Sequence, residues 1–303
     1  MASSKLEARS LTQPLKAGSA LSMKTLSDNV MVAMSALLVC TLILFSSMPS
    51  VAKASSERII STDAGTTEIL VALGKGESLV GIDVTSRVPE GLNPAKVGYH
   101  RNLAAEGLLS LAPDILFGSQ HIGPEVTLNA LKSADVTLVV QPIAKDSDQL
   151  IRNVKMVADS VGVSGQSLID QVNVASDKIQ TTQEQRAELN AVFLLYMEGR
   201  GLKQAGTGTT GDALIKLLGM NNASDHQNYR SVSAEGLLAM QPDVVLIGTQ
   251  NPEAAEALMK QHASLQYTPA AKNKRILTVD ASALVAGISL KAMEEAIRLA
   301  DSL

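Results

Sequence analysis

The sequence predicts an α/β protein in which a helical segment joins two similar lobes. Short apolar runs of strand character alternate with amphipathic stretches, which is typical of largely parallel sheets covered by helices. A ten-residue motif occurs twice, as AEGLLSLAPD from Ala105 and as AEGLLAMQPD from Ala234, with seven identical positions. The copies lie 129 residues apart, which is too long for a solenoid repeat and indicates two lobes.

Residues 1–54 are typical of a secretory signal peptide. The run from Val30 to Phe45 holds sixteen residues without a charge; basic residues precede it, and Ala52-Lys53-Ala54 follows it. We expect cleavage after Ala54 and export to the periplasm, and the alternative is an uncleaved membrane anchor. The only cysteine, Cys40, lies in the apolar run, so a cleaved protein would have no disulfide and no cysteine ligand.

The first lobe is expected at residues 55–162. Apolar and β-branched residues predict its strands at 58–61, 78–86, 114–118 and 134–142. Helices are predicted at 65–74, at the first copy of the motif and at 146–162. Thr66 and Thr67 are the candidate N-cap residues of the first helix, and Gly74 is its candidate stop. In the last helix, the apolar residues recur at helical spacing and predict a buried face: Leu150, Val154, Val157 and Val161.

A single connecting helix is expected at residues 163–187, with Ser164 as its cap. This stretch has no proline and only one glycine, so it does not read as a flexible linker. About 22 helical residues would span roughly 33 Å and limit how far the lobes can close. The second lobe is expected at 188–303, with strands at 191–199, 243–248 and 275–281 and a helix at 208–219.

Composition excludes several classes of function. The formal net charge of −4 argues against nucleic acid as a partner, because nucleic acid needs a basic protein face. Aromatic residues make up 2% of the chain and tryptophan is absent, so stacking platforms for bases or sugars are not expected. The sequence has neither a G-x-S-x-G elbow nor a G-x-G-x-x-G dinucleotide fingerprint, and we therefore expect a binding protein that is not an enzyme.

Tyr99, His100 and Arg101 stand in a row just before the first copy of the motif. In an extended segment, Tyr99 and Arg101 would share a face and His100 would point away. A neighbouring guanidinium favours the phenolate form of tyrosine, and a phenolate oxygen can bind ferric iron. The alternative is a tyrosine packed at the edge of a lobe, with Arg101 in an ordinary salt bridge.

The chain resembles the helical-backbone, or class III, substrate-binding proteins of ABC importers for iron chelates, cobalamin and haem. The resemblance rests on the combination of an export signal, two α/β lobes, one long connecting helix and the paired AEGLL…PD motif. VGYHRNLAAEGLLSLAPD and MEGRGLKQAGTGTTGDALIKLLGMNNA are similar to the haem-binding members in particular. It implies two Rossmann-like lobes joined by a single long backbone helix, with the ligand in the cleft between the lobes.

The resemblance also implies site residues. Haem b would be the transported ligand in iron uptake, with Tyr99 as the axial ligand of its iron and Arg101 supporting the phenolate. The family usually has an apolar residue between them, and here it is His100, which becomes the alternative ligand. Arg200 and Arg230 are candidates to pair with the haem propionates, as is Lys203, and Tyr229 is a candidate ligand contact.

Glu106 and Glu235 are the candidate docking residues. Each lies in the first turn of a motif helix, where a carboxylate also suits the helix dipole without any further role. In the resembled class, one glutamate per lobe binds arginines of the membrane permease, which works with an ATPase. We expect a monomeric haem carrier. The alternative is the same fold carrying a ferric siderophore or cobalamin, neither of which needs a phenolate ligand.

Overall fold

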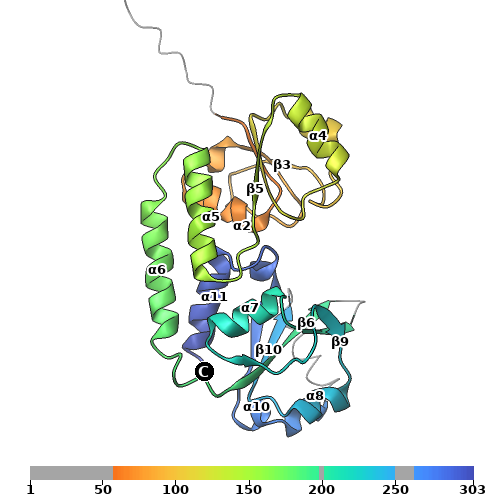
Figure 1. Ribbon diagram of the computed structural model, residues 1–303, viewed down its shortest axis with the longest axis vertical. Helices are drawn as coiled ribbons and strands as arrows, with labels where there is room; N and C mark the ends of the chain where they lie inside the picture. The colour runs from red at the N-terminus through yellow and green to blue at the C-terminus, as the bar shows by residue number, and fades with distance from the viewer. Residues whose placement is uncertain (1–56, 198–200, 250–262) are drawn as a thin grey trace, which may run out of the picture. The chain divides into compact units, whose positions relative to one another are not determined.

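Two β-sheets organise the residues that the computed structural model describes, 57–197, 201–249 and 263–303 (Figure 1). The first sheet has the strand order β3-β2-β1-β4-β5, and every neighbouring pair is parallel. Its strands are β1 (Ile59–Ser61), β2 (Leu79–Ile82), β3 (Ala95–Lys96), β4 (Ile115–Ser119) and β5 (Thr137–Gln141). The elements between them are α2 (Ala64–Ala72), η1 (Gly76–Ser78), α3 (Ala105–Leu109) and α4 (Glu125–Ser133), and α5 (Ser147–Ser160) follows β5.

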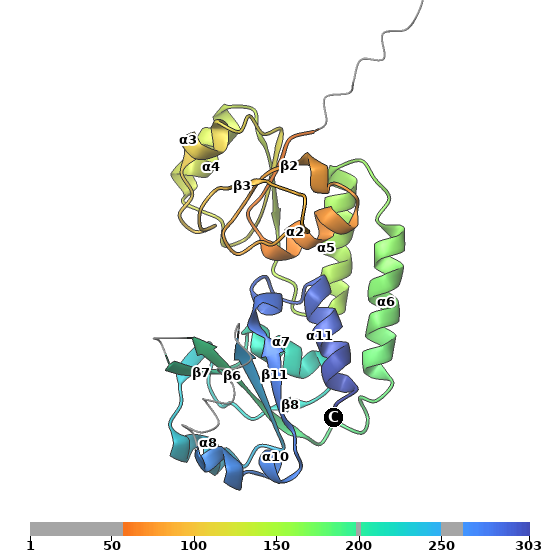
Figure 2. The same cartoon turned by 180° about the vertical axis from the view of Figure 1, so that it is seen from behind.

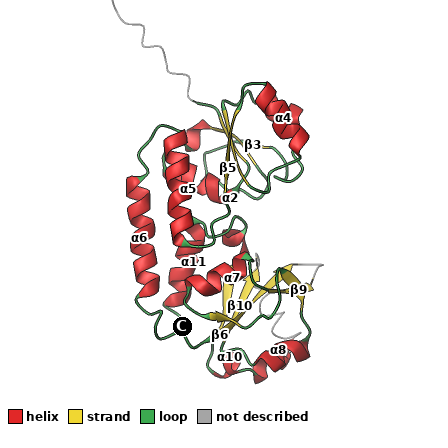
Figure 3. Ribbon diagram, in the orientation of Figure 1, coloured by secondary structure: helices red, strands yellow, loops and turns green. Residues whose placement is uncertain are grey.

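Helices cover both faces of the first sheet (Figure 3). Successive side chains of a strand point to opposite faces. Ile59 and Phe117 therefore pack with α2 and α5, whereas Ile60 and Leu116 pack with α3 and α4. The buried face predicted for the 146–162 segment is confirmed, because all four of its apolar residues are at most 5% exposed.

The start of α2 differs from the sequence expectation. Asp63 is the N-cap residue, and its carboxylate accepts hydrogen bonds from the backbone N–H and the hydroxyl of Thr66. Thr66 and Thr67 are buried inside the helix instead of capping it. The predicted stop is confirmed: Gly74 follows the helix with a φ of 76°, a conformation that glycine adopts without strain.

The second sheet is mixed. Its order is β11-β10-β6-β7-β9, with β8 pairing with β6 off this path. Its strands are β6 (Asn190–Met197), β7 (Gly201–Ala205), β8 (Asn221–Asn222), β9 (Tyr229–Ser231), β10 (Val244–Thr249) and β11 (Ile276–Asp280). Strand β7 pairs antiparallel with both β6 and β9, and sequence reasoning missed it because it is short, begins with glycine and buries the polar Gln204.

The faces of the second sheet are covered in the same manner as those of the first. Phe193 and Leu246 pack with α7 (Thr210–Leu217) and α11 (Leu290–Ala300). Val192 and Ile247 pack on the opposite side with α8 (Ala234–Met240), η2 (Ala263–Tyr267) and α10 (Pro269–Lys272). The short η3 (Ala281–Leu284) precedes α11. Among the described helices, none is both long enough and apolar enough to span a membrane.

The two copies of the repeated motif adopt the same local structure. Each forms a short helix, α3 or α8, followed by a Pro-Asp turn and a buried strand, β4 or β10, as predicted. The equivalence extends to the backbone: Ala112 has a φ of 44° and Gln241 a φ of 42°, both directly before the proline of their copy. Gln241 is the C-cap residue of α8, whereas Ala112 lies two residues after Ser110, the C-cap of α3; both precede the turn that leads into the strand.

Helix α6 (Gln166–Gln180) carries the chain from the first sheet towards the second, and it lies alongside α5 and α11 in both views (Figure 1, Figure 2). It has 15 residues, so it is shorter than the predicted connecting helix of about 22 residues. Gly165 is its N-cap residue, while the hydroxyl of Ser164 accepts from the N–H of Gln166. Two hydrogen-bonded turns, Gln183 N–H to the Gln180 carbonyl and Arg186 N–H to the Gln183 carbonyl, replace the expected last turns.

Arg186 fixes the chain just after the end of α6. The residue is 2% exposed, and its guanidinium group donates to the carbonyl oxygens of Ile179 at 2.7 Å, Leu218 at 2.9 Å and Ala300 at 3.3 Å. It therefore ties the end of α6 to α7 and to the end of α11.

Changing Arg186 to Ala should destabilise the protein by about 3 kcal/mol, because buried carbonyl oxygens lose charged hydrogen-bond donors. Urea unfolding measures this loss. Arg152→Ala is the control, since Arg152 is exposed and its side chain, within the described part of the chain, bonds only to Gln149 of the same helix. An Arg186→Ala midpoint equal to that of the control would contradict this role.

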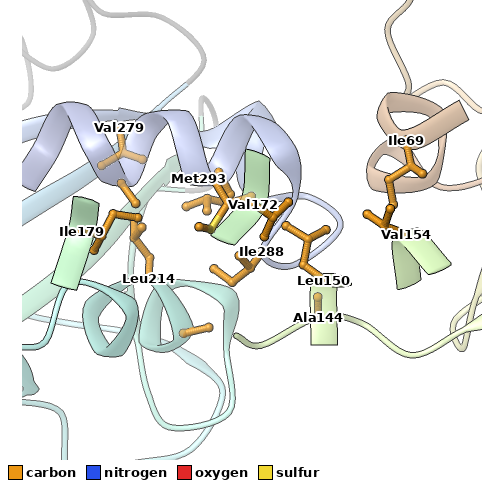
Figure 4. Close-up of a cluster of buried hydrophobic side chains, with 14 of the residues drawn as sticks. Ile69, Ala144, Leu150, Val154, Val172, Ile179, Leu214, Val279, Ile288 and Met293 are labelled. Carbon is orange, nitrogen blue, oxygen red and sulfur yellow. The ribbon is translucent and has the colours of Figure 1, made fainter. Parts of the chain in front are cut away.

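One buried apolar cluster contains residues from both lobes (Figure 4). Val154 of α5, Val172 of α6, Leu214 of α7 and Met293 of α11 all belong to it. The backbone also joins the lobes: the Ile288 N–H donates to the Ala144 carbonyl oxygen at 2.8 Å. Residues from Ser56 to Leu303 accordingly form one compact unit.

Candidate functional site

Polar side chains gather at the carboxyl edge of the first sheet. Strands β1, β2, β4 and β5 are parallel, so the residues that follow them meet at one edge, which is where α/β sheets usually bind ligands. Asp63 follows β1, Asp83 follows β2, His121 follows β4 and Gln141 ends β5. The Tyr99 segment follows β3, and the Gly98 carbonyl oxygen accepts from the Val84 N–H, so this segment lies at the same edge.

The Tyr99 segment is a turn and not an extended strand. The Asn102 N–H donates to the Tyr99 carbonyl oxygen at 2.8 Å, which closes the turn. The Gly123 N–H donates to the His100 carbonyl oxygen at 2.9 Å and ties the turn to the loop after β4. The expectation that His100 points away from Tyr99 is therefore wrong, because the two ring centroids lie 4.3 Å apart, with 45° between the ring planes.

Tyr99 and Arg101 are both available at the surface of this edge. Tyr99 is 46% exposed and Arg101 is exposed. Within the described residues, the Tyr99 hydroxyl forms no hydrogen bond and Arg101 forms no ion pair. The alternative in which Arg101 serves an ordinary salt bridge thus finds no partner in this part of the chain.

The Asp83 carboxylate binds the imidazole of His100. The imidazole Nδ1 lies 3.0 Å from Asp83 Oδ2, and the aspartate side chain is completely buried. Sequence reasoning missed Asp83, although an aspartate directly after the buried strand LVGI marks the carboxyl edge of a parallel sheet.

The charges around Tyr99 are mixed. Burial lowers the pKa of His121, and the positive charges of Arg101 and His100 lower it further. Burial raises the pKa of Asp63, against the hydrogen bonds that Thr66 donates to it. His121 is therefore neutral at neutral pH, and Arg101 is the permanent positive charge beside Tyr99.

In the second lobe, Tyr229 and Arg230 lie on the edge strand β9. The Gly211 N–H, in the first turn of α7, donates to the Tyr229 hydroxyl oxygen at 3.3 Å, and burial raises the pKa of this phenol. Arg230 is exposed and, among the described residues, has no ion-pair partner. The ammonium of Lys203 donates to the Ser231 hydroxyl at 2.7 Å, so it lies beside this strand. Arg200 lies outside the described residues.

Glu106 and Glu235 occupy the first turns of α3 and α8, as predicted, and both are exposed. The Glu235 side chain accepts from its own backbone N–H and from Ser233, and these hydrogen bonds lower its pKa. Ser233 is also the N-cap residue of α8, whereas Ala104 at the equivalent place before α3 offers no side-chain cap. Across the described residues, no cluster of three or more histidine, cysteine or acidic side chains could hold a metal ion.

The model of the periplasmic binding protein family matches residues 59–283. The chain belongs to the periplasmic binding protein family. A crystal structure of the periplasmic heme binding protein HutB of Vibrio cholerae is 36% identical; the match covers 82% of this chain and 99% of HutB, with a TM-score of 0.73. A structure of a periplasmic heme binding protein from Pseudomonas aeruginosa is 32% identical over 81% of this chain and 92% of its own, with a TM-score of 0.70.

Sequence comparison alone gives a different relative. The vitamin B12-binding protein of Yersinia pestis is 24% identical over 207 residues, which are 65% of this chain and 71% of that protein. Together the comparisons confirm the predicted class III fold of this periplasmic binding protein. They also confirm the prediction of a binding protein and not an enzyme, and they leave the ligand class to be argued from the site.

Proposed function

We propose that this periplasmic binding protein captures haem b between its two lobes and delivers it to an ABC transporter permease with its ATPase. The observation that carries the proposal is Tyr99, an exposed phenol at the carboxyl edge of the first sheet with no internal hydrogen bond in the described structure. The structures from Vibrio cholerae and Pseudomonas aeruginosa, at 36% and 32% identity, are described as heme binding proteins, which supports this ligand.

The chemistry of the site suits ferric haem. Tyr99 would bind the iron as a phenolate, and the positive charge of Arg101 favours that form. Arg230 would meet a propionate carboxylate with two parallel hydrogen bonds from its guanidinium group, and Lys203 would meet one with the single charge of its ammonium. Arg200 is a further candidate for this role. The apolar disc of haem needs no tryptophan, because leucine, valine and methionine side chains can cover it.

Cobalamin is the second candidate, because a relative at 24% identity is a vitamin B12-binding protein. Cobalamin and ferric siderophores carry their metal already coordinated, so they give no role to a free phenol. The choice between these ligands therefore depends on whether Tyr99 binds iron.

A hemin titration tests the proposal. The exported protein, purified from the periplasm, should bind hemin with a visible charge-transfer band typical of a phenolate–iron bond. A tenfold excess of cobalamin or of a ferric siderophore should not displace the hemin. Saturable binding of cobalamin without a hemin spectrum would overturn the proposal in favour of the second candidate.

Export is a separate expectation. We predict that the mature protein begins at Ser55, because Ala52-Lys53-Ala54 follows the apolar run. N-terminal sequencing of the periplasmic protein checks this. Recovery of the protein only in the membrane fraction, with residues before Val51 still present, would instead show an uncleaved anchor.

A further inference from the structure

We propose that Asp83 and His100 form a positioning pair that holds the Tyr99 phenol in the orientation in which it binds iron. This inference rests on the proposed function, because it gives a role to two residues behind the proposed ligand. It also gives His100 a different role from the alternative ligand that the sequence suggested.

The first step is that hydrogen bonds fix the side chain of Asp83. Its Oδ1 accepts from the Ser86 N–H at 3.0 Å and from the Ser86 hydroxyl at 2.6 Å. Its Oδ2 accepts from the Thr85 hydroxyl at 2.7 Å. The Ser86 hydroxyl oxygen also accepts from the Thr67 hydroxyl of α2 at 3.0 Å, which connects these hydrogen bonds to the first helix. A carboxylate with this many donors and no exposed surface has one orientation.

The second step is the orientation of His100. Because the oxygens of Asp83 act as acceptors, the hydrogen of the imidazole must lie on Nδ1. The side chain is 12% exposed, and the backbone of the same residue is tied to Gly123. Both the ring and its backbone are therefore fixed.

The third step is the freedom of Tyr99. Its side chain is 46% exposed, and its hydroxyl forms no hydrogen bond in the described part of the chain. The stacking on His100 is the only ring–ring contact among the described residues. An aromatic pair of this kind favours one orientation of an otherwise mobile ring. Asp83 therefore orients His100, and His100 in turn restrains the ring of Tyr99.

The same geometry favours Tyr99 over His100 as the iron ligand. The bond to Asp83 leaves Nε2 of the imidazole free, so exposure decides: the His100 side chain is 12% exposed, whereas Tyr99 is 46% exposed with a free oxygen. A ligand approaching this edge therefore has better access to the phenol.

Three variants test the pair. His100→Ala removes the ring, His100→Phe keeps the ring without its hydrogen bond, and Asp83→Asn keeps an acceptor without the charge. His226→Ala is the control, because His226 lies in the second lobe and its ring, among the described residues, bonds only to the neighbouring Gln227 carbonyl oxygen. Urea unfolding of each variant checks that the fold survives.

Hemin dissociation is the first readout. His100→Ala should keep the phenolate charge-transfer band and release hemin about tenfold faster, which is the upper range for loss of an aromatic pair. His100→Phe should release hemin at a rate between those of His100→Ala and the wild type, because its ring lacks the hydrogen bond to Asp83, and His226→Ala should match the wild type. A His100→Ala variant that keeps the wild-type rate would overturn the proposal. A wild-type spectrum that lacks the phenolate band and changes in His100→Ala would also overturn it, because His100 would then be the ligand.

NMR of the ligand-free protein is the second readout. The chain has four tyrosines, and the resonances of Tyr99 are assigned by their absence from Tyr99→Phe. We expect an upfield ring-current shift of Tyr99 that disappears in His100→Ala and weakens in both His100→Phe and Asp83→Asn, because these two variants keep a ring but lose or weaken its bond to residue 83. If the wild type showed no hemin band but kept this shift, the proposed function would fail and the positioning contact would stand. A Tyr99 spectrum that His100→Ala leaves unchanged would remove the contact itself.

Discussion

Tyr99→Phe should lose the phenolate charge-transfer band and bind hemin at least about a hundredfold more weakly, a loss of about 2.7 kcal/mol. The change removes only the hydroxyl oxygen, which has no protein partner in the described structure, so the fold should survive. The phenyl ring can still stack on His100 as the tyrosine ring does. The visible spectrum during a hemin titration, together with the fitted Kd, measures the effect.

Tyr267→Phe is the matched control. Tyr267 is 61% exposed and ends η2 in the second lobe, outside the proposed site, so its change should leave both the band and the Kd unaltered. A Tyr99→His variant should bind hemin again with a different spectrum, because imidazole can replace phenolate as an axial ligand. A wild-type spectrum in Tyr99→Phe would show that Tyr99 is not the ligand.

Arg101→Ala should make hemin binding more sensitive to acid. Protons compete with iron for the phenolate oxygen, and loss of the nearby positive charge helps the proton. Binding by the variant should therefore fail at a higher pH than binding by the wild type as the pH is lowered. Hemin titrations between pH 5 and pH 8 measure the two profiles, and coincident profiles would show that Arg101 does not act on the phenolate.

Much of the fold could be predicted because its signals are local. The strands 58–61 and 114–118 are short apolar runs between turn residues, and both are buried in the first sheet. The motif helices could be matched to each other by sequence identity alone, and even their left-handed residues, Ala112 and Gln241, are equivalent.

The errors arose where distant residues decide local structure. The connecting helix ends at Gln180, and Arg186 then binds carbonyl oxygens at the ends of α6, α7 and α11; helical periodicity contains no information on such distant partners. The predicted cap of α2 was wrong, because the Asp63 carboxylate and not a threonine hydroxyl accepts from the backbone N–H of Thr66.

The site shows the same limit. Tyr99 and Arg101 could be selected from their residue types and from a family resemblance. Asp83, which lies 17 positions before its partner His100, could not be paired with it. The assumption of an extended segment also failed, because hydrogen bonds to the loop at Gly123 fold the Tyr99 segment into a turn.

Changing both Glu106 and Glu235 to Ala should leave hemin affinity unchanged and reduce haem uptake by cells at least about tenfold. Both carboxylates are exposed in equivalent first turns, and one glutamate per lobe would suit a permease of two related subunits. Charges at the rim of an interface act mainly on orientation and association rate, so either single change should do less than the pair. Uptake by a haem-requiring strain, with parallel hemin titrations of the purified variants, measures both quantities.

The matched control is the double change of Glu90 and Glu188 to Ala, which removes the same charge from exposed positions outside the motif helices. This control separates docking from a general effect of net charge, because only the first pair lies on the repeated helices. A stability control is also needed, since a first-turn carboxylate favours its own helix by up to about 1 kcal/mol. Equal urea midpoints for the two double variants would exclude helix loss as the cause of reduced uptake. Normal uptake by the Glu106/Glu235 variant at equal expression would mean that the two glutamates serve only their helices.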